Sequence, residues 1–287
     1  MSANRAPLVS IGVPVFNGER YVAETLDSLL AQTFRDIEVV VADNGSTDRT
    51  PDIVRGYVAR DPRVRHVRSE ENRGAAWNYR RVARLAHGRY FKWAASDDLV
   101  APTFIQRCLD ALAAHPEAVL AYPRTRIIDE HGRAVEDFDD RLHLVSASPS
   151  DRLSSFLRNV RLTNAVYGLM PTAVLRRTPM MANYVGSDIC LLAELSLRGT
   201  FREIPEVLFF RRFHPSCSSM HRDAEHLTVF FDPSRRARRV RETWRHIFEY
   251  WRFTTRVPLT TPERMRTARI LLRQTWWARQ ALLQELL

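Results

Sequence analysis

Two adjacent carboxylates, Asp97 and Asp98, follow a short and mostly apolar run of the sequence, Tyr90–Ala95. An apolar run that ends in polar residues is typical of a buried strand, and ligands bind at the edge of an α/β sheet formed by the carboxyl ends of its strands. Paired carboxylates at such an edge suit Mg²⁺ or Mn²⁺, which in turn bind phosphate groups. The pair could instead form an Asx turn or cap the helix expected to begin near Pro102.

Strands and helices alternate through the first 125 residues, and this alternation is what would position the two acids. The runs that predict strands are Leu8–Phe16, Ile37–Ala42, Val64–Val67, the run before Asp97 and Ala118–Tyr122. Segments with helical spacing of apolar residues separate them. Alternation of this kind indicates βαβ units, hence an α/β fold with a mostly parallel central sheet flanked by helices.

Right-handed crossovers would bring the loops that follow these strands to one edge of the sheet. Those loops are Pro14–Glu19, Asp43–Asp48, Arg73–Gly74 and Asp97–Asp98. Neither a Gly-x-Gly-x-x-Gly fingerprint nor a Walker Gly-Lys-Ser/Thr loop is present. Phosphate would therefore be held by a metal on the acidic pair, and by Arg73 at the start of a helix, where free N–H groups favour anions.

The same loops carry a resemblance to a known family. The residues concerned are Val-Pro-Val-Phe-Asn-Gly-Glu at 13–19, Val-Ala-Asp-Asn-Gly-Ser-Thr-Asp-Arg-Thr at 41–50, Asn-Arg-Gly at 72–74, and Ser-Asp-Asp at 96–98 with Pro102. In these segments the sequence resembles the family 2 glycosyltransferases, inverting enzymes of the GT-A fold that use nucleotide sugars. The resemblance is good over the first 125 residues and weaker to about Ser219. It implies a catalytic domain at 1–220, with a nucleotide-binding half (1–125) and an acceptor half (126–220), followed by a basic helical extension (221–287).

The resemblance also implies roles for particular residues. The nucleotide sugar would be bound by Pro14, Val15, Phe16, Asn17, Glu19, Asp43, Asn44, Arg73, Ser96, Asp97 and Arg212, with Asp43 accepting a hydrogen bond from the base. A Mn²⁺ or Mg²⁺ ion would be held by Asp97, Asp98 and His214. The family's commonest acidic motif is Asp-x-Asp-Asp, and its first acid is Ala95 here. A sugar-nucleotide-binding protein with weak catalysis therefore remains an alternative. A nucleotidyltransferase is another, although its usual glycine-rich basic loop after the first strand is missing.

In the acceptor half, Asp188 stands at the start of a strongly helical segment, Ile189–Leu197. It could simply cap the helix, but the family has its catalytic base at such a position, and inverting transfer needs one carboxylate to take the proton of the acceptor hydroxyl. Segment 135–150 has no clear period and is predicted to be a mobile loop. Strands are predicted at Val166–Met170 and at Val207–Ser216, where Arg211 or Arg212 could clamp the diphosphate. The acceptor could be a growing glycan, a lipid-linked intermediate or a secondary metabolite.

Most of the net charge of +10 belongs to the C-terminal part, because residues 221–287 contain 14 Arg and only 7 Asp and Glu. Four of the six tryptophans lie in two amphipathic helical segments there, Arg235–Phe253 and a second one in which Met265, Ala268, Leu272 and Trp276 are in register. Basic helices with Trp favour an anionic membrane surface. Packing on the catalytic domain and a homodimer seam are the alternatives, and nucleic acid is not expected, because the acidic loops would repel it.

A cytoplasmic protein is predicted from the three isolated cysteines, the N-terminus without an apolar signal core and the lack of a long apolar run. A peripheral position on the inner face of the membrane is compatible with the same features.

Overall fold

The computed structural model describes residues 6–215, 217, 230–232 and 241–286. Its first sheet has the strand order β3-β2-β1-β4-β8, in which the first four strands are parallel and β8 is antiparallel to β4. The strands are β1 (Val9–Val15), β2 (Ile37–Asp43), β3 (Val64–Arg68), β4 (Tyr90–Trp93) and β8 (Met170–Pro171). The predicted parallel sheet is therefore present and includes the strand before Asp97.

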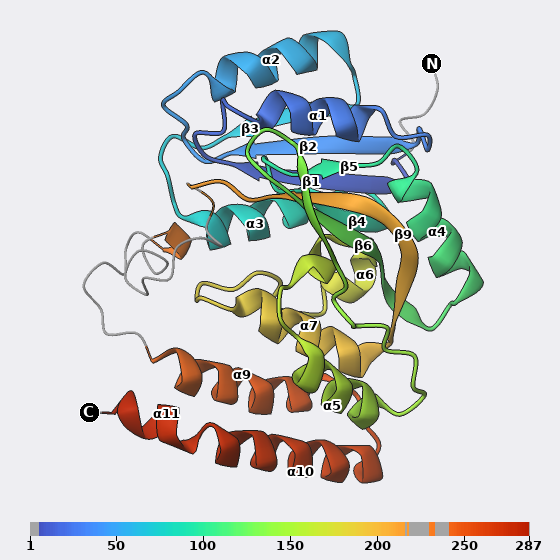
Figure 1. The fold of residues 1–287 in the computed structure, drawn as a ribbon, viewed down its shortest axis with the longest axis vertical. Helices are drawn as coiled ribbons and strands as arrows, with labels where there is room; N and C mark the ends of the chain where they lie inside the picture. Colours follow the sequence, from blue (N-terminus) through green and yellow to red (C-terminus); the bar gives the residue numbers. More distant parts are fainter. Residues whose placement is uncertain (1–5, 216, 218–229, 233–240, 287) are drawn as a thin grey trace.

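Helices cover both faces of this sheet (Figure 1). Two of them lie on one face, α1 (Val22–Leu30) and α2 (Thr50–Arg60), and α3 (Ala75–Arg84) lies on the other. Every residue of β1 and β2 is buried, as the nearly continuous apolar runs predict for strands covered on both sides. Two hydrophobic cores result, one on each face of the sheet.

A second sheet has the order β5-β9-β6-β7. Its strands are β5 (Leu99–Val100), β6 (Ala118–Ile128), β7 (Ala134–Phe138) and β9 (Thr200–Arg212), and only β6 and β9 are parallel. The strand predicted at Ala118–Tyr122 thus belongs to this sheet and continues to Ile128. One bridge, between Ala121 and Leu169, connects it to the first sheet, and α4 (Phe104–Ala114) contacts both β6 and β9.

Three predictions for the acceptor half need correction. Segment 135–150 contains β7, and Leu142 and Leu144 after it are buried in the main core, so it is not the predicted mobile loop. The strand predicted at Val166–Met170 starts with the last two residues of a 3₁₀ helix, η1 (Asn164–Tyr167), and only Met170 at its end belongs to a strand, the two-residue β8. The last strand, β9, starts earlier than predicted and ends at Arg212; Ser216 lies outside the described residues.

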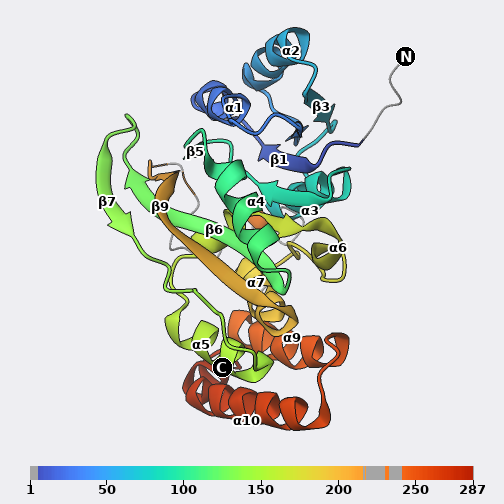
Figure 2. The same ribbon diagram turned by 90° about the vertical axis from the view of Figure 1, so that its right-hand side faces the viewer.

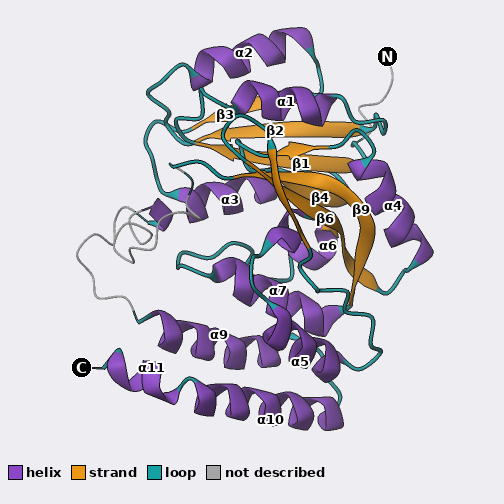
Figure 3. Cartoon of the chain, in the orientation of Figure 1, coloured by secondary structure: helices purple, strands orange, loops and turns teal. Residues whose placement is uncertain are grey.

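Helices form the remainder of the described chain: α5 (Pro149–Asn159), α6 (Thr172–Leu175), α7 (Ser187–Arg198), α9 (Glu242–Arg256), α10 (Thr261–Trp277) and α11 (Arg279–Gln284). Figures 2 and 3 show α9 beyond α7 and at the level of α5, with α10 farther out than both. Tyr250, Phe253 and Leu271 belong to the same hydrophobic core as the acceptor half.

Buried charges reinforce this contact, since Glu194 on α7 accepts hydrogen bonds from Arg198 at 2.6 Å and from Arg256 at 2.7 Å. The inner faces of the C-terminal helices thus pack on the rest of the chain. The predicted domain boundary at 220/221 and the helical start at 235–240 lie outside the described residues.

All three cysteines are buried and free. None of the helices in the described ranges combines the length and the apolar character needed to cross a bilayer.

Candidate active site

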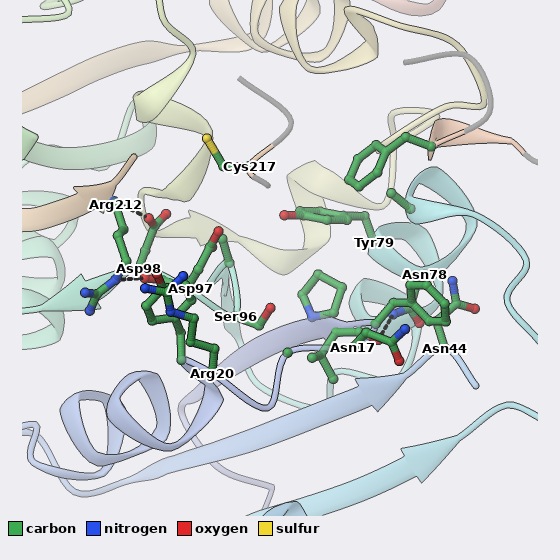
Figure 4. A pocket seen from close by; sticks show the side chains of 18 of the residues that line it. Asn17, Arg20, Asn44, Asn78, Tyr79, Ser96, Asp97, Asp98, Arg212 and Cys217 are labelled. Atoms are coloured by element: carbon green, nitrogen blue, oxygen red, sulfur yellow. Dashed lines mark hydrogen bonds between the residues drawn. The ribbon is translucent and has the colours of Figure 1, made fainter. Parts of the chain in front are cut away.

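A pocket of about 590 Å³ opens at the carboxyl edge of the first sheet, where β1, β2 and β4 end (Figure 4). Loops from both sheets close it. Its walls are formed by Pro14, Val15, Phe16, Asn17, Gly18, Arg20, Tyr21, Asn44, Asn72, Ala75, Asn78, Tyr79, Ala95, Ser96, Asp97, Asp98, Tyr167, Arg211, Arg212, His214, Cys217 and Phe230. The sequence-predicted residues that it brings together are Pro14, Val15, Phe16, Asn17, Asn44, Ser96, Asp97, Asp98, Arg212 and His214.

The loop after β1 is held by the loop after β2. The backbone N–H of Asn17 donates to Ser46 Oγ at 2.9 Å, and the N–H of Gly18 donates to Thr50 Oγ1 at 2.8 Å. In return, Asn17 Oδ1 accepts from the N–H of Thr47 at 2.8 Å. The hydroxyls and amides of the 43–50 segment therefore fix the shape of one pocket wall, which is a structural reason for that residue pattern.

Asp43 lies behind this wall and is fully buried. Its Oδ1 accepts from the N–H of Ser46 at 2.8 Å, and its Oδ2 lies 3.5 Å from His66 Nε2 and 3.4 Å from Arg68 Nε. Burial raises the carboxyl pKa, but the hydrogen bonds from His66 and Ser46 outweigh it, and the net pKa is lowered. The ionised side chain braces the turn, and it is not among the residues that line the pocket.

Two further predicted donor-binding residues are turned away from the pocket. Glu19 accepts from the backbone N–H of Arg49 at 3.0 Å, and the Arg73 guanidinium stacks over the ring of Trp77 at 4.7 Å. Neither lines the cavity. The amide of Asn44 instead links the loops, donating to Asn72 Oδ1 at 2.8 Å and accepting from the N–H of Arg73 at 3.1 Å.

At the opposite end of the pocket, Asp97 and His214 meet, with Asp97 Oδ2 3.0 Å from His214 Nε2. The Asp97 side chain is 27% exposed and that of His214 is 10% exposed, so both are open to the cavity. The ring of Tyr21 packs on the imidazole with 4.9 Å between ring centroids. Residues 117 positions apart in the sequence thus form one pair of metal-type ligands.

Asp98 is in a different environment, although it is adjacent in sequence. Its Oδ1 accepts from the backbone N–H of Arg212 at 2.8 Å, and the side chain is almost completely buried. Burial, reinforced by the charge of Asp97, raises its pKa to about 8, while Arg211 and the Arg212 N–H act in the opposite direction. Asp98 therefore anchors β9 to the β4 loop, and its burial favours the protonated form.

The guanidinium of Arg212 forms hydrogen bonds with three other residues of the protein. It donates to the carbonyl of Asp97 at 2.9 Å, to Glu24 Oε2 at 2.7 Å and to the carbonyl of Glu130 at 3.2 Å. The prediction that it clamps a diphosphate is not favoured by this geometry. Its neighbour Arg211 also lines the pocket and donates to Asn164 Oδ1.

The predicted base, Asp188, lies in the first turn of α7 and accepts a hydrogen bond from Thr163 Oγ1. It is not among the pocket-lining residues. Thr163 directly precedes η1, whose last residue, Tyr167, does line the pocket. Asp188 is therefore linked to the cavity wall through Thr163 and the η1 turn.

Residues 10–181 match the family described as glycosyl transferase family 2. The chain belongs to this family. Among curated relatives, chondroitin synthase of Escherichia coli is 30% identical over 221 residues, which are 75% of this chain and 30% of that protein. Hyaluronan synthase of Pasteurella multocida is 33% identical over 132 residues, or 46% and 14% of the two chains. The chain thus spans less than a third of these relatives. Membership of the family removes the nucleotidyltransferase alternative.

Solved structures show the same fold. S. aureus TarS, residues 1–349 in complex with UDP, superposes with a TM-score of 0.65 over 95% of this chain and 73% of that chain, at 18% identity. The Pyrobaculum calidifontis mannosyltransferase PcManGT, in complex with GDP-Man and Mn²⁺, gives 0.58 over 98% and 74%, also at 18% identity. The GT-A fold predicted from the sequence is confirmed.

The metal-binding side chains at this end of the pocket fit a divalent cation that is also bound by a ligand. They do not fit a cation enclosed by protein side chains alone. In the described part of the chain no group of three or more His, Cys, Asp or Glu side chains comes together as a metal cage. Asp97 and His214 nevertheless converge on one point, while one oxygen of Asp98 is already engaged by Arg212. Mg²⁺ and related ions are commonly held by one or two side chains plus phosphate oxygens and water.

Several pocket residues were not predicted from the sequence, among them Asn78, Tyr79, Tyr167, Cys217 and Phe230. Asn78 and Tyr79 lie within α3, where the apolar spacing only indicates a helix. The hydroxyls of Tyr79 and Tyr167 lie 3.3 Å apart and join α3 to η1. No local sequence pattern predicts such a contact, because its two partners are 88 residues apart.

Proposed function

We propose that this family 2 glycosyltransferase moves a sugar from a nucleotide-diphosphate donor to a hydroxyl acceptor, with inversion at the anomeric carbon. The observation that carries the proposal is the single pocket in which the loops after β1 and β2 face the Asp97–His214 pair. A cavity with amide groups at one end and acid and imidazole groups at the other fits a nucleoside joined to a diphosphate.

The two ends of the pocket suggest how the donor lies. Figure 4 shows Asn17, Asn44 and Asn78 together at one end, Asp97 and Asp98 at the other, and Ser96 between them. The nucleoside would occupy the amide end and the diphosphate the acidic end. Asp97 and His214 would hold a Mn²⁺ or Mg²⁺ ion, which when bound supplies positive charge to the departing diphosphate. TarS has been solved in complex with UDP and with UDP-GlcNAc, and PcManGT in complex with GDP-Man, so uracil and guanine are both to be tested.

Asp188 is the proposed base. An acceptor hydroxyl next to the η1 turn would give its proton to this carboxylate as it attacks the anomeric carbon, and the bond from carbon to the diphosphate oxygen would break. Support comes from Thr163, whose hydroxyl donates to Asp188 and which directly precedes the η1 turn that ends at the pocket-lining Tyr167. Asp188→Asn should abolish transfer and leave donor binding unchanged. Asp151→Asn, in the first turn of α5 on the protein surface, is the matched control and should transfer normally.

The donor proposal is tested by isothermal calorimetry with UDP, GDP and dTDP, each with and without Mn²⁺. One nucleotide should bind, and Mn²⁺ should tighten it. Asp97→Asn should remove most of the Mn²⁺ effect, by about ten-fold or more in Kd, whereas Asp110→Asn on α4 should not. Binding by none of the nucleotides, or Mn²⁺ dependence that survives in Asp97→Asn, would refute the assignment.

Ala95 favours a second candidate, a nucleotide-sugar-binding protein with little catalysis, because it replaces an acid at the wall of the pocket. Hydrolysis of the donor in the absence of acceptor separates the two. A slow Mn²⁺-dependent release of sugar supports the enzyme, and donor binding with no release over hours supports the binding protein. For the acceptor, a glycan, a lipid-linked intermediate and a secondary metabolite all fit the proposal. An anionic membrane surface and a second copy remain the two proposed partners of the C-terminal helices.

A further inference from the structure

The outermost helices of the molecule, α10 and α11, are apolar on two opposite sides. Their inner side is buried and includes Leu271 and Leu282. On the outer side Met265, Leu272, Trp276 and Leu283 are 54%, 60%, 65% and 62% exposed. Ala278, in the right-handed helical conformation, is the one residue between the two helices, and Figure 1 shows α11 continuing the line of α10. We call these four residues the outer stripe.

The outer stripe is one continuous line. Its positions are separated by seven, four and seven residues, and side chains at these separations fall on the same face of a helix. From residue 265 to 283 a helix extends about 27 Å. A run of more than half-exposed Leu, Met and Trp side chains of this length is unusual for a surface that faces only water.

The charges beside the outer stripe have one sign. Arg269, Arg273 and Arg279 are exposed next to it, and Arg273 and Arg279 stack over Trp277 and Trp276 at 5.0 and 4.4 Å.

Both acids of the described segment 261–286 are bound on the inner side. Glu263 accepts from the backbone N–H of Ser150 at 2.9 Å, and Glu285 accepts from that of Thr243 at 2.9 Å. The outward charge of these helices is therefore basic.

We propose that the outer stripe and its arginines dock the protein on an anionic lipid bilayer, with α10 and α11 lying flat in the headgroup region. Leu, Met and Trp would enter the acyl boundary, and the arginines would remain with the lipid phosphates. A second copy is a poorer occupant, because two-fold pairing would place basic rows against each other with no acid on that face. A nucleic acid would leave the apolar side chains in water. In Figures 1 and 2 the first sheet lies at the end of the molecule away from α10, so docking leaves it clear of the bilayer.

The test uses the whole chain and sedimentation with vesicles of phosphatidylcholine alone or with about one third phosphatidylglycerol. The protein should bind the anionic vesicles and dissociate from them at high salt. It should not bind the neutral vesicles. Leu272→Ser with Trp276→Ser should lower the partition coefficient roughly ten-fold or more. Val135→Ser, at a 64% exposed position on β7, is the matched control and should bind like the wild type.

Arg269→Glu with Arg273→Glu should also release the protein. Tryptophan fluorescence of the wild-type chain should be quenched by brominated lipid in the anionic vesicles, a readout that needs no variant. The proposal is overturned by vesicle binding that the serine pair leaves intact, by absence of quenching, or by a dimer in light scattering that the serine pair dissociates.

Discussion

Replacing Asp140 by Asn should remove a pH-dependent loss of stability that this single carboxyl imposes. Asp140 is 3% exposed, and the groups that favour its charged form are Arg211 and Asn164. Burial raises its pKa to about 7, opposed mainly by the positive charge of Arg211 and by Asn164. The folded protein therefore keeps a proton on Asp140 at pH values where the unfolded chain has already released it.

The sign and size of this change in the free energy of unfolding follow from the linkage between protonation and folding. Because the folded pKa is raised, the stabilising effect of the proton is complete below about pH 4 and is lost as the pH rises to about 7. Between pH 4.5 and pH 8 a group with a pKa near 3.9 in the unfolded chain and near 7 in the folded one lowers the free energy of unfolding by about 3 kcal/mol. Asn at this position carries no proton to release, so it should not show that loss.

The assay is urea unfolding followed by circular dichroism at intervals from pH 4.5 to pH 8. The free energy of unfolding of wild type minus that of Asp140→Asn should fall by about 3 kcal/mol across this range. Asp139→Asn, at the adjacent exposed acid, is the control and should run parallel to the wild type. A difference between wild type and Asp140→Asn that is flat with pH would show that the carboxyl is solvated or ionised in the folded protein, and the reasoning from burial would be wrong.

Three further perturbations probe the supports of the site. Gly186→Ala should destabilise the protein by about 2 kcal/mol or more in urea unfolding, because Gly186 has φ +76° and a Cβ there would lie 2.5 Å from His246 Nε2. An unchanged unfolding midpoint would mean that the turn before α7 changes its conformation without cost. Ser46→Ala removes the acceptor of the Asn17 N–H, and it should weaken nucleotide binding about five-fold by calorimetry while the protein stays folded; equal affinity would separate this loop from the donor. Glu194→Ala should lower the free energy of unfolding by about 3 kcal/mol, since it leaves two arginines on α7 and α9 without their buried partner. A loss below about 1 kcal/mol would show that the C-terminal helices are held by apolar contacts alone.

Local patterns in the sequence were enough to predict β1 to β4 and the helices between them. Proline at 14 near the end of the first apolar run, the Asn17-Gly18 turn and the acids after Trp93 each restrict the backbone or its hydrogen bonding within a few residues. The edge at which Asn17, Ser96 and Asp97 meet followed from these elements and from the handedness of their connections.

The tertiary structure alone decided which neighbouring residues differ in role. Asp97 faces the pocket and Asp98 is buried, although the two are neighbours in one turn. Arg211 and Arg212 differ because adjacent residues of a strand point in opposite directions, and the sequence does not say which side will be covered. The pairing of β6 with β9 and the contact of His214 with Asp97 join segments about 80 to 120 residues apart. Such contacts depend on the packing of the whole chain, whereas strands, helices and turns depend on the residues within them.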